Sequence, residues 1–301
     1  MMEKDIIKSG FIGLIGRTNV GKSTLVNKIL KQKILITSDK VQTTRNLIRC
    51  ILNTDRSQII FVDSPGFFKP KNLFQQRLNN AANRVIGDVD IIVVVVDAAG
   101  GIGRGDKFVF EQIRKSKLPK ILLLNKIDLA EAGELRKQGE EIESKELFDD
   151  ILEISAKTGE NLDKFIRILE DRLPEGPRYY DEDMVCDQTW EKILSEIVRE
   201  KLFKNLSDEI PHSIIVEVDD FKQSRTRSGE KLISAECTVY AERNSQKAII
   251  IGKSGHMLKR VGRQARLELE ELFGNKVFLQ LWVKVRKNWT KEESFLDRFG
   301  Y

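Results

Sequence analysis

The first residues that could carry chemistry lie near the start of the chain. Gly16, Gly21, Lys22 and Ser23 match the pattern G-x-x-x-x-G-K-S, directly after a β-rich run and at the start of a helical pattern. In this pattern backbone N–H groups surround a phosphate, the lysine reaches the β and γ oxygens, and the serine hydroxyl binds Mg²⁺. The alternative is an ordinary glycine turn, since chance produces the pattern in roughly one chain in a hundred of this length. The pattern predicts a nucleotide site made of Gly16, Arg17, Thr18, Asn19, Val20, Gly21, Lys22, Ser23 and Thr24.

Three further short motifs follow, each at the end of a β-rich run. After 59–62 comes a carboxylate, Asp63, that can reach Mg²⁺ through water, while a backbone N–H nearby can meet the γ-phosphate. After 121–124 comes Asp128, whose carboxylate can accept from N1–H and N2–H₂ of guanine, a donor pair that adenine lacks. After 153–154 a backbone N–H can donate to guanine O6. These motifs consist of Asp63, Ser64, Pro65 and Gly66; Asn125, Lys126 and Asp128; and Ser155, Ala156 and Lys157.

The elements that must position these motifs alternate between strand and helix. Residues 11–15, 48–52, 59–62, 91–96, 120–124 and 153–154 are predicted strands, and helical spacing appears between several of them. Such alternation indicates a mostly parallel sheet covered on both faces. The carboxyl edge of such a sheet is where these folds bind ligands, so the motifs predict one GTP or GDP site there.

Residues 1–173 resemble the Ras-like GTPases of the translation-factor class, whose G1, G3, G4 and G5 motifs fall on these residues. The resemblance implies catalytic roles for Lys22, Thr44 and Gly66, with Mg²⁺ bound by Ser23, Thr44 and Asp63. Thr44 is preferred as the switch I threonine because related GTPases carry Thr-Arg at that point, and Thr43 is the alternative. Related GTPases also use an asparagine at the position of Asn19 to hold K⁺.

One position departs from the Ras pattern. Ras-type enzymes carry a water-orienting glutamine after Asp-x-x-Gly, whereas this chain has Phe67. A phenyl ring cannot orient water by hydrogen bonding. We therefore expect slow intrinsic GTP hydrolysis unless a partner or a bound cation supplies the missing group.

The second half has a different order of elements. Residues 174–188 are polar and begin with Pro-Glu-Gly-Pro, which predicts a linker. A helix over 190–206, strands over 214–218 and 233–239, helices over 245–251 and 258–272, and a strand over 277–285 follow. This α-β-β-α-α-β order predicts a type II KH domain over 189–301, with a C-terminal tail.

The sequence Gly252-Lys253-Ser254-Gly255 lies between the two adjacent helices. It matches the GXXG loop with which KH domains clamp the backbone of single-stranded nucleic acid. The segment 243–266 carries seven basic residues and no acidic one, although residues 174–301 as a whole are neutral. This segregation favours an anion-binding surface, with a solvated helix face as the alternative. The predicted RNA contacts are Gly252, Lys253, Ser254, Gly255, Lys259, Arg260 and Arg263. Trp282 and Trp289 could stack on bases, but for Trp282 packing in the core or on a strand face is favoured.

Composition excludes several other classes. The longest aliphatic run, 91–96, is far shorter than a membrane-spanning helix, and the first residues lack the apolar core of a signal peptide. Three cysteines form neither a disulfide framework nor a metal pair, and two histidines are too few for a histidine-rich metal site. The chain is expected to be a soluble protein of the reducing cytoplasm.

A Ras-like domain followed by a type II KH domain is similar to the Era family of bacterial GTPases, over nearly the whole chain. The resemblance rests on residues 42–46, 63–66 and 249–255. It implies a switch that binds the 3′ end of 16S rRNA, assists assembly of the 30S subunit, and associates peripherally with the inner membrane, as a monomer. Two alternatives are a tRNA-modification GTPase, which would bring an extra domain, and a membrane-surface regulator whose basic segment meets anionic lipid.

Overall fold

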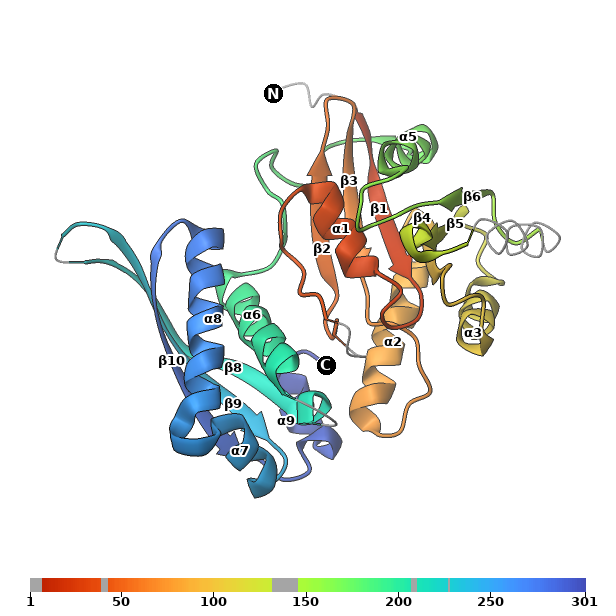
Figure 1. Ribbon diagram of the computed structural model, residues 1–301. Coiled ribbons are helices and arrows are strands. Elements are labelled where there is room, and N and C mark those ends of the chain that lie inside the picture. The colour runs from red at the N-terminus through yellow and green to blue at the C-terminus, as the bar shows by residue number, and fades with distance from the viewer. Residues whose placement is uncertain (1–6, 39–42, 132–145, 207–209, 227) are drawn as a thin grey trace. The chain divides into compact units, whose positions relative to one another are not determined.

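The computed structural model describes residues 7–38, 43–131, 146–206, 210–226 and 228–301 (Figure 1). The chain divides into two compact units, Met1–Asp187 with Tyr301, and Gln188–Gly300. This boundary lies at the end of the predicted linker. Each unit has its own buried apolar core, and the two units are described separately below.

The first unit is built on a seven-stranded sheet. Its main order is β2-β3-β1-β4-β5-β6, and the two-residue β7 (Glu175–Gly176) pairs with β1. The pairs β1–β3, β1–β4, β4–β5 and β5–β6 are parallel, while β2 is antiparallel to β3. The strands are β1 (Ile7–Ile15), β2 (Ile48–Asn53), β3 (Ser57–Asp63), β4 (Ile91–Asp97), β5 (Lys120–Asn125) and β6 (Asp150–Glu153).

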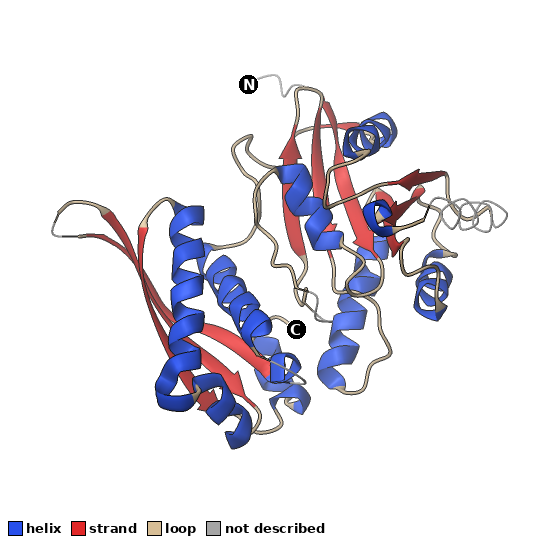
Figure 2. Cartoon of the chain, viewed as in Figure 1, coloured by secondary structure: helices blue, strands red, loops and turns tan. Residues whose placement is uncertain are grey.

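Helices cover this sheet, as Figures 1 and 2 show. They are α1 (Lys22–Leu30), α2 (Leu73–Gly87), α3 (Arg104–Ile113) and α5 (Leu162–Arg172), with a 3₁₀ turn at Ile127–Leu129. Because helices lie on both faces, the central strands are apolar on both faces, and residues 91–96 of β4 are all buried. The predicted mostly parallel sheet is confirmed, with strand ends shifted by a few residues.

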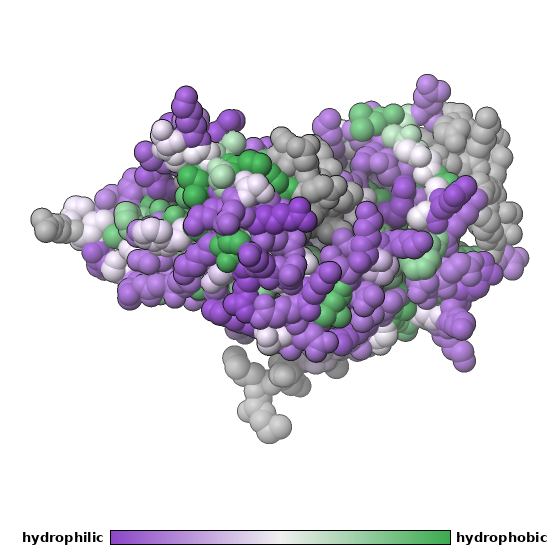
Figure 3. All heavy atoms as spheres, turned by 90° about the horizontal axis from the view of Figure 1, so that it is seen from below, coloured by the Kyte–Doolittle hydropathy of each residue, from purple (hydrophilic) through white to green (hydrophobic). Residues whose placement is uncertain are grey.

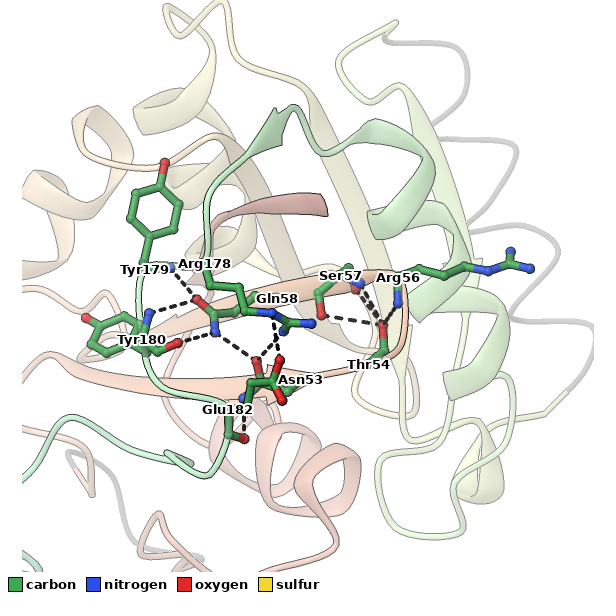
Figure 4. A network of polar contacts seen from close by, with 9 residues as sticks. All are labelled: Asn53, Thr54, Arg56, Ser57, Gln58, Arg178, Tyr179, Tyr180 and Glu182. Carbon is green, nitrogen blue, oxygen red and sulfur yellow. Dashed lines mark hydrogen bonds and ion pairs between the residues drawn. The ribbon is translucent and has the colours of Figure 1, made fainter. Parts of the chain in front are cut away.

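The segment 174–187 differs from the predicted linker because it is bound along the first unit. Gln58, which is fully buried, accepts hydrogen bonds from the backbone N–H groups of Tyr179 and Tyr180, and its amide donates to Tyr180 O and Asn53 Oδ1 (Figure 4). Asn53 Nδ2 also donates to Glu182 O. Most of the side chains of this segment are exposed, and it is the backbone that hydrogen-bonds to the β2–β3 hairpin.

The second unit packs helices on one face of a three-stranded sheet (Figure 2). The strand order is β10-β9-β8, with β9 antiparallel to β8 and parallel to β10. Helices α6 and α8 pack on each other and on β8 and β10. The elements are α6 (Trp190–Asn205), β8 (Ile214–Arg225), β9 (Lys231–Ala241), α7 (Asn244–Ile251), α8 (His256–Phe273), β10 (Lys276–Val285) and α9 (Glu293–Arg298). The predicted α-β-β-α-α-β order is confirmed.

The surface is mainly polar where Figure 3 views it, with small hydrophobic patches between hydrophilic side chains. Among the described residues, no helix combines the length and the apolar character that crossing a bilayer requires.

Candidate functional site

The phosphate-binding loop is formed where β1 ends and α1 begins. Gly21 has φ +101°, and a Cβ atom there would lie 2.3 Å from Nδ2 of Asn125. A Cβ atom at Gly16 would lie 2.5 Å from the carbonyl oxygen of Val95. Neither position has space for a side chain, and the positive φ at Gly21 is a second reason for glycine there. The turn leaves the N-terminus of α1 at Lys22, where helical N–H groups attract an anion.

Lys22 is almost fully buried inside this loop. Its Nζ donates to the carbonyl oxygens of Arg17 (2.9 Å) and Gly16 (3.3 Å). Burial lowers the pKa of Lys22 to about 8, and the nearby Asp63 carboxylate acts in the opposite direction. The carbonyl oxygens are neutral acceptors, whereas a phosphate bound in the loop would give the ammonium group a charged acceptor and a stronger hydrogen bond.

Ser23, Thr44 and Asp63 meet beside the loop, from three separate segments. Ser23 Oγ donates to Asp63 Oδ2 over 2.9 Å, Thr44 Oγ1 donates to the same oxygen over 3.2 Å, and the two hydroxyls are 3.1 Å apart. Thr44, the threonine preferred from the sequence, therefore lies with the other two predicted Mg²⁺ ligands.

The Asp63 carboxylate provides a test of whether a cation fits here. It is fully buried, and its Oδ1 atom has no hydrogen-bond partner among the described residues. Burial raises the pKa of Asp63, whereas Lys22 and the bonds from Ser23 and Thr44 lower it. A buried carboxylate oxygen without a donor is costly, and hydroxyl and carboxylate oxygens are ligands that Mg²⁺ accepts. The residues present fit a magnesium ion.

The chain after Asp63 lies against the phosphate-binding loop. A Cβ atom at Gly66 would lie 2.6 Å from the backbone nitrogen of Thr18, so the position has room only for glycine. Phe67 N donates to Gly16 O over 3.1 Å, and Ser64 Oγ donates to Leu14 O over 2.8 Å. Pro65 is buried between them.

The phenyl ring of Phe67 belongs to the core. It is 4% exposed and makes an edge contact with Phe108. It therefore packs as an apolar side chain at the position where Ras-type enzymes have their glutamine.

The two motifs predicted to bind guanine, 125–128 and 155–157, contact each other. Asp128 is exposed, and Ser155 Oγ donates to its Oδ1 over 2.6 Å. Asn125 is buried and hydrogen-bonds to two different loops. Its Nδ2 donates to Val20 O in the phosphate-binding loop (2.8 Å), and its Oδ1 accepts from Ala156 N in the loop after β6 (2.9 Å). Asp128 is thus placed to meet a base, while Asn125 positions the loops around it.

The remaining predicted residues of the nucleotide site lie around these groups. Lys126 Nζ forms an ion pair with Asp97 over 2.6 Å, and Arg17 forms one with the buried Asp106 over 2.8 Å. Asn19 is exposed, with φ +64°, at the turn of the loop. Thr24, in α1, and Lys157 are both exposed and line a surface hollow together with Lys28.

The second predicted site is the turn between α7 and α8. Gly252 has φ +72°, and a Cβ atom there would lie 2.7 Å from Cβ of Met257. Gly255 has φ +75°, and a Cβ atom there would have no neighbour within 4 Å. Between them Lys253 and Ser254 are exposed. The loop therefore offers an open backbone surface with a lysine at its edge and the N-terminus of α8 behind it.

The three residues of α8 that were predicted to contact RNA, Lys259, Arg260 and Arg263, are all exposed. Arg263 follows Lys259 by four residues and Arg260 by three, so it neighbours both on the helix surface. Arg260 also lines the hollow between α6 and α8 together with Lys204, Glu268 and Glu271. It therefore has carboxylates close by as well as the neighbouring basic residues.

The structure also locates two tryptophans whose roles the sequence left open, and one exposed isoleucine that the sequence analysis did not single out. Trp289 is fully buried, and its Nε1 donates to Ser213 O, so it is a core residue. Trp282 is 51% exposed on β10. It is therefore not a core residue, and of the two packing roles favoured for it only packing on the face of the strand is left. Ile249 is 50% exposed beside the GXXG turn. The run of three isoleucines at 249–251 could have revealed it, since on so short a helix they cannot all face the core.

Comparison with known proteins assigns a family to each of the two units. Residues 11–126 match the family described as 50S ribosome-binding GTPase, and residues 209–290 match the KH domain family. The fold and the site together define a P-loop GTPase that carries a KH domain.

Individual relatives identify the family more narrowly. The chain is 46% identical to GTPase Era of Caldanaerobacter subterraneus subsp. tengcongensis, over 98% of each chain. It is also similar to the crystal structure of Era in complex with MgGDPNP and nucleotides 1506–1542 of 16S ribosomal RNA, with a TM-score of 0.94, 34% identity, and coverage of 98% and 99%. Aquifex aeolicus Era with a tyrosine-to-alanine substitution, bound to GDP·AlF₄⁻, gives a TM-score of 0.93 at 34% identity, with the same coverage. The chain belongs to the Era family of GTPases.

Proposed function

We propose that the protein is a GTP-driven switch whose output is binding of single-stranded RNA at the 3′ end of 16S rRNA, in support of 30S subunit assembly. The observation that carries the proposal is the similarity, over 98% of this chain, to an Era structure that holds MgGDPNP and nucleotides 1506–1542 of that RNA. The GXXG turn and the exposed Lys253, Lys259 and Arg263 offer an RNA-binding surface in this chain.

In the nucleotide site, each group of this chain has a distinct role. Lys22 binds the β- and γ-phosphate oxygens, and the backbone N–H of Gly66 approaches the γ-phosphate. Mg²⁺, when bound, neutralises phosphate charge and would be held by Ser23, Thr44 and Asp63. Asp128 accepts from guanine N1–H and N2–H₂, while backbone N–H groups of residues 155–157 donate to O6. Ser23, Thr44 and Asp63 already converge over 2.9–3.2 Å.

GTP hydrolysis by this site is slow in the absence of an activator. The buried Phe67 has no group that can position the attacking water. A K⁺ ion held by Asn19 near the β- and γ-phosphates would place positive charge where an arginine finger acts in other GTPases.

The protein acts as a monomer in the cytoplasm and associates peripherally with the inner membrane. Sedimentation with anionic liposomes, beside an RNA gel shift on the same preparation, separates lipid binding from RNA binding. Binding to liposomes without binding to RNA would favour the membrane-surface regulator instead.

The direct test of the proposed function is binding of a fluorescent oligonucleotide with the sequence of the 16S rRNA 3′ end. We expect saturable binding, with the same oligonucleotide scrambled in sequence binding more weakly. Equal affinity for both sequences would leave a GTPase with an unspecific RNA surface and would refute the rRNA assignment.

A further inference from the structure

Two of the three cysteines, far apart in the sequence, oppose each other in the first unit. Cys50 lies in β2 and is fully buried, while Cys186 lies in the boundary segment (174–187) and is half-buried. Their backbones form an isolated antiparallel β-bridge. None of the three cysteines, all of which lie in described segments, is in a disulfide in the structure.

The backbone register around this pair is defined by two hydrogen bonds. Ile51 N donates to Val185 O over 3.0 Å, and Asp187 N donates to Arg49 O over 3.1 Å. The two bonds flank the cysteines, which makes Cys50 and Cys186 a non-hydrogen-bonded antiparallel pair. In such pairs the Cα atoms are about 4.5 Å apart and the side chains are close. Disulfides form at Cα separations of about 4.4–6.8 Å, so the register admits a bond.

Neighbouring contacts hold the two segments together. Arg49 forms an ion pair with Asp187 over 3.2 Å, and Arg49 N donates to Asp187 Oδ1. Further along, Gln58 and Asn53 bind the backbone of residues 179–182 (Figure 4). Because the backbone is already in place, joining the sulfur atoms requires little more than side-chain rotation.

We propose that Cys50 and Cys186 form a reversible intramolecular disulfide when the protein meets a peroxide, and that the bond fastens the boundary segment to β2. This modification site goes beyond the proposed function and does not depend on it.

The chemistry takes two steps. Cys186, the more accessible of the two, loses its proton, and its thiolate attacks a peroxide oxygen and breaks the O–O bond. This gives a sulfenic acid at Cys186, and with hydrogen peroxide the displaced hydroxide takes up the thiol proton as one water. Cys50 then loses its proton, its thiolate attacks the Cys186 sulfur, the S–S bond forms, and the hydroxyl of the sulfenic acid leaves with that proton as a second water. The two sulfurs together lose two electrons to the peroxide. A cellular dithiol reverses the change by thiol–disulfide exchange, as expected for a bond in a reducing compartment.

The proposed disulfide lies between switch I and the start of the second unit in the sequence. β2 begins at Ile48, four residues after Thr44, and the second unit begins at Gln188, two residues after Cys186. The disulfide would covalently join the strand that follows switch I to the chain that leads into the second unit. The amides of Ile51 and Asp187, which are hydrogen-bonded across the pair, should then exchange more slowly.

The experiment exposes the reduced full-length protein to hydrogen peroxide, blocks remaining thiols in denaturant, and maps the peptides by mass spectrometry without reduction. We expect a cross-linked peptide pair containing Cys50 and Cys186, with the loss of two hydrogen atoms, restored by dithiothreitol. Cys237 is the internal control, because it is fully buried in β9 and should be recovered as a blocked thiol.

Matched variants complete the test. Cys50→Ser and Cys186→Ser should both abolish the cross-link, whereas Cys237→Ser should leave it unchanged. Hydrogen–deuterium exchange of the oxidised parent should show increased protection at residues 51 and 187, reversed by dithiothreitol. Sulfinic acid at Cys186 without a cross-link, or a cross-link that involves Cys237, would overturn the proposal.

Discussion

The hydroxyl group of Ser155 donates a hydrogen bond to Oδ1 of Asp128 over 2.6 Å, although the two residues are 27 positions apart in the sequence. Ser155 is fully buried, while Asp128 is exposed. The buried hydroxyl therefore sets the direction in which the carboxylate points, and it links two motifs from the ends of neighbouring strands β5 and β6.

Base specificity depends on this carboxylate. In Asp128→Asn, the amide NH₂ would face the N–H donors of guanine, so we expect GTP affinity to fall by about 10–100-fold, as for loss of a charge-assisted hydrogen bond. Affinity for xanthosine triphosphate should rise, because xanthine has a carbonyl oxygen in place of the N2 amino group. Competition binding with both nucleotides measures the change. Ser155→Ala is the control, since it should weaken binding of both bases without reversing the preference, and undiminished GTP binding by Asp128→Asn would show that guanine is recognised elsewhere.

Nucleotide binding should be linked to proton uptake above pH 8. Burial lowers the pKa of Lys22 to about 8 in the free protein, and a bound phosphate raises it again by favouring the charged form. Between about pH 8 and the ordinary lysine value of 10.5, affinity should therefore fall by up to tenfold per pH unit as one proton must be taken up. Calorimetry at pH 8.5 in buffers of different ionisation enthalpy measures the uptake. Absence of proton uptake would contradict the assigned contact between Lys22 and phosphate.

The same shift makes a prediction for stability. A lysine whose pKa is lower in the folded than in the unfolded state binds fewer protons when folded. The free energy of unfolding of the nucleotide-free protein should therefore gain a contribution from Lys22 as pH rises from about 8 to 10.5. Lys22→Met removes this contribution, so denaturant melts of the parent and of Lys22→Met compared across this range isolate it from other titrating groups.

Potassium should stimulate hydrolysis. Asn19 lies at the turn of the phosphate-binding loop, and Phe67 offers no polar group for catalysis. We expect faster GTP hydrolysis in K⁺ than in Na⁺ at equal ionic strength, and loss of the difference in Asn19→Ala. Phosphate release measured in the two salts tests this. Equal rates in both salts, with Asn19→Ala unaffected, would exclude a cation at this position.

RNA binding should depend on the GXXG turn. Gly255→Asp is a better test than Gly252→Asp, because a side chain at 255 has open space whereas one at 252 meets Met257. A carboxylate at 255 would lie where a phosphate must approach, and we expect RNA affinity to fall by about tenfold or more through like-charge repulsion while GTP binding is retained. Gly274→Asp is a matched control, since Gly274 also has positive φ (+63°) and open space but ends α8 at its other terminus. If Gly255→Asp binds RNA like Gly274→Asp, the binding surface lies elsewhere.

The two sites should be coupled. Thr44, the switch I threonine, contacts Ser23 and Asp63, and Phe67 N donates to Gly16 O in the phosphate-binding loop. Segments of this kind respond to the γ-phosphate. We expect RNA affinity to differ between the GTP-analogue and GDP states by about 1–3 kcal/mol. Linkage requires that RNA change the ratio of affinities for the two nucleotides by the same factor. Titrations of RNA with each nucleotide, and of nucleotide with and without RNA, measure both; identical RNA affinities would leave two tethered but independent modules.

The sequence by itself determined the fold class and the local binding motifs. The phosphate-binding loop is contiguous, and its geometry follows from a strand, two glycines and a helix start, so Gly16 to Ser23 could be recognised directly. Apolar runs such as 91–96 indicated buried strands because a strand covered on both faces has no polar side. The GXXG turn was recognisable for the same reason as the first loop.

Only the tertiary structure decided which distant segments meet. The contact of Thr44 with Ser23 and Asp63, the position of Arg260 at the hollow between α6 and α8, and the burial of Trp289 all depend on which segments pack together in the folded chain. The sequence predicted a polar linker over 174–188, but it could not show that the backbone of this segment hydrogen-bonds to Gln58 and to the backbone of β2. Hydrogen bonding between segments more than a hundred residues apart depends on the assembled sheet, and so the pairing of Cys50 with Cys186 could be found only in the folded protein.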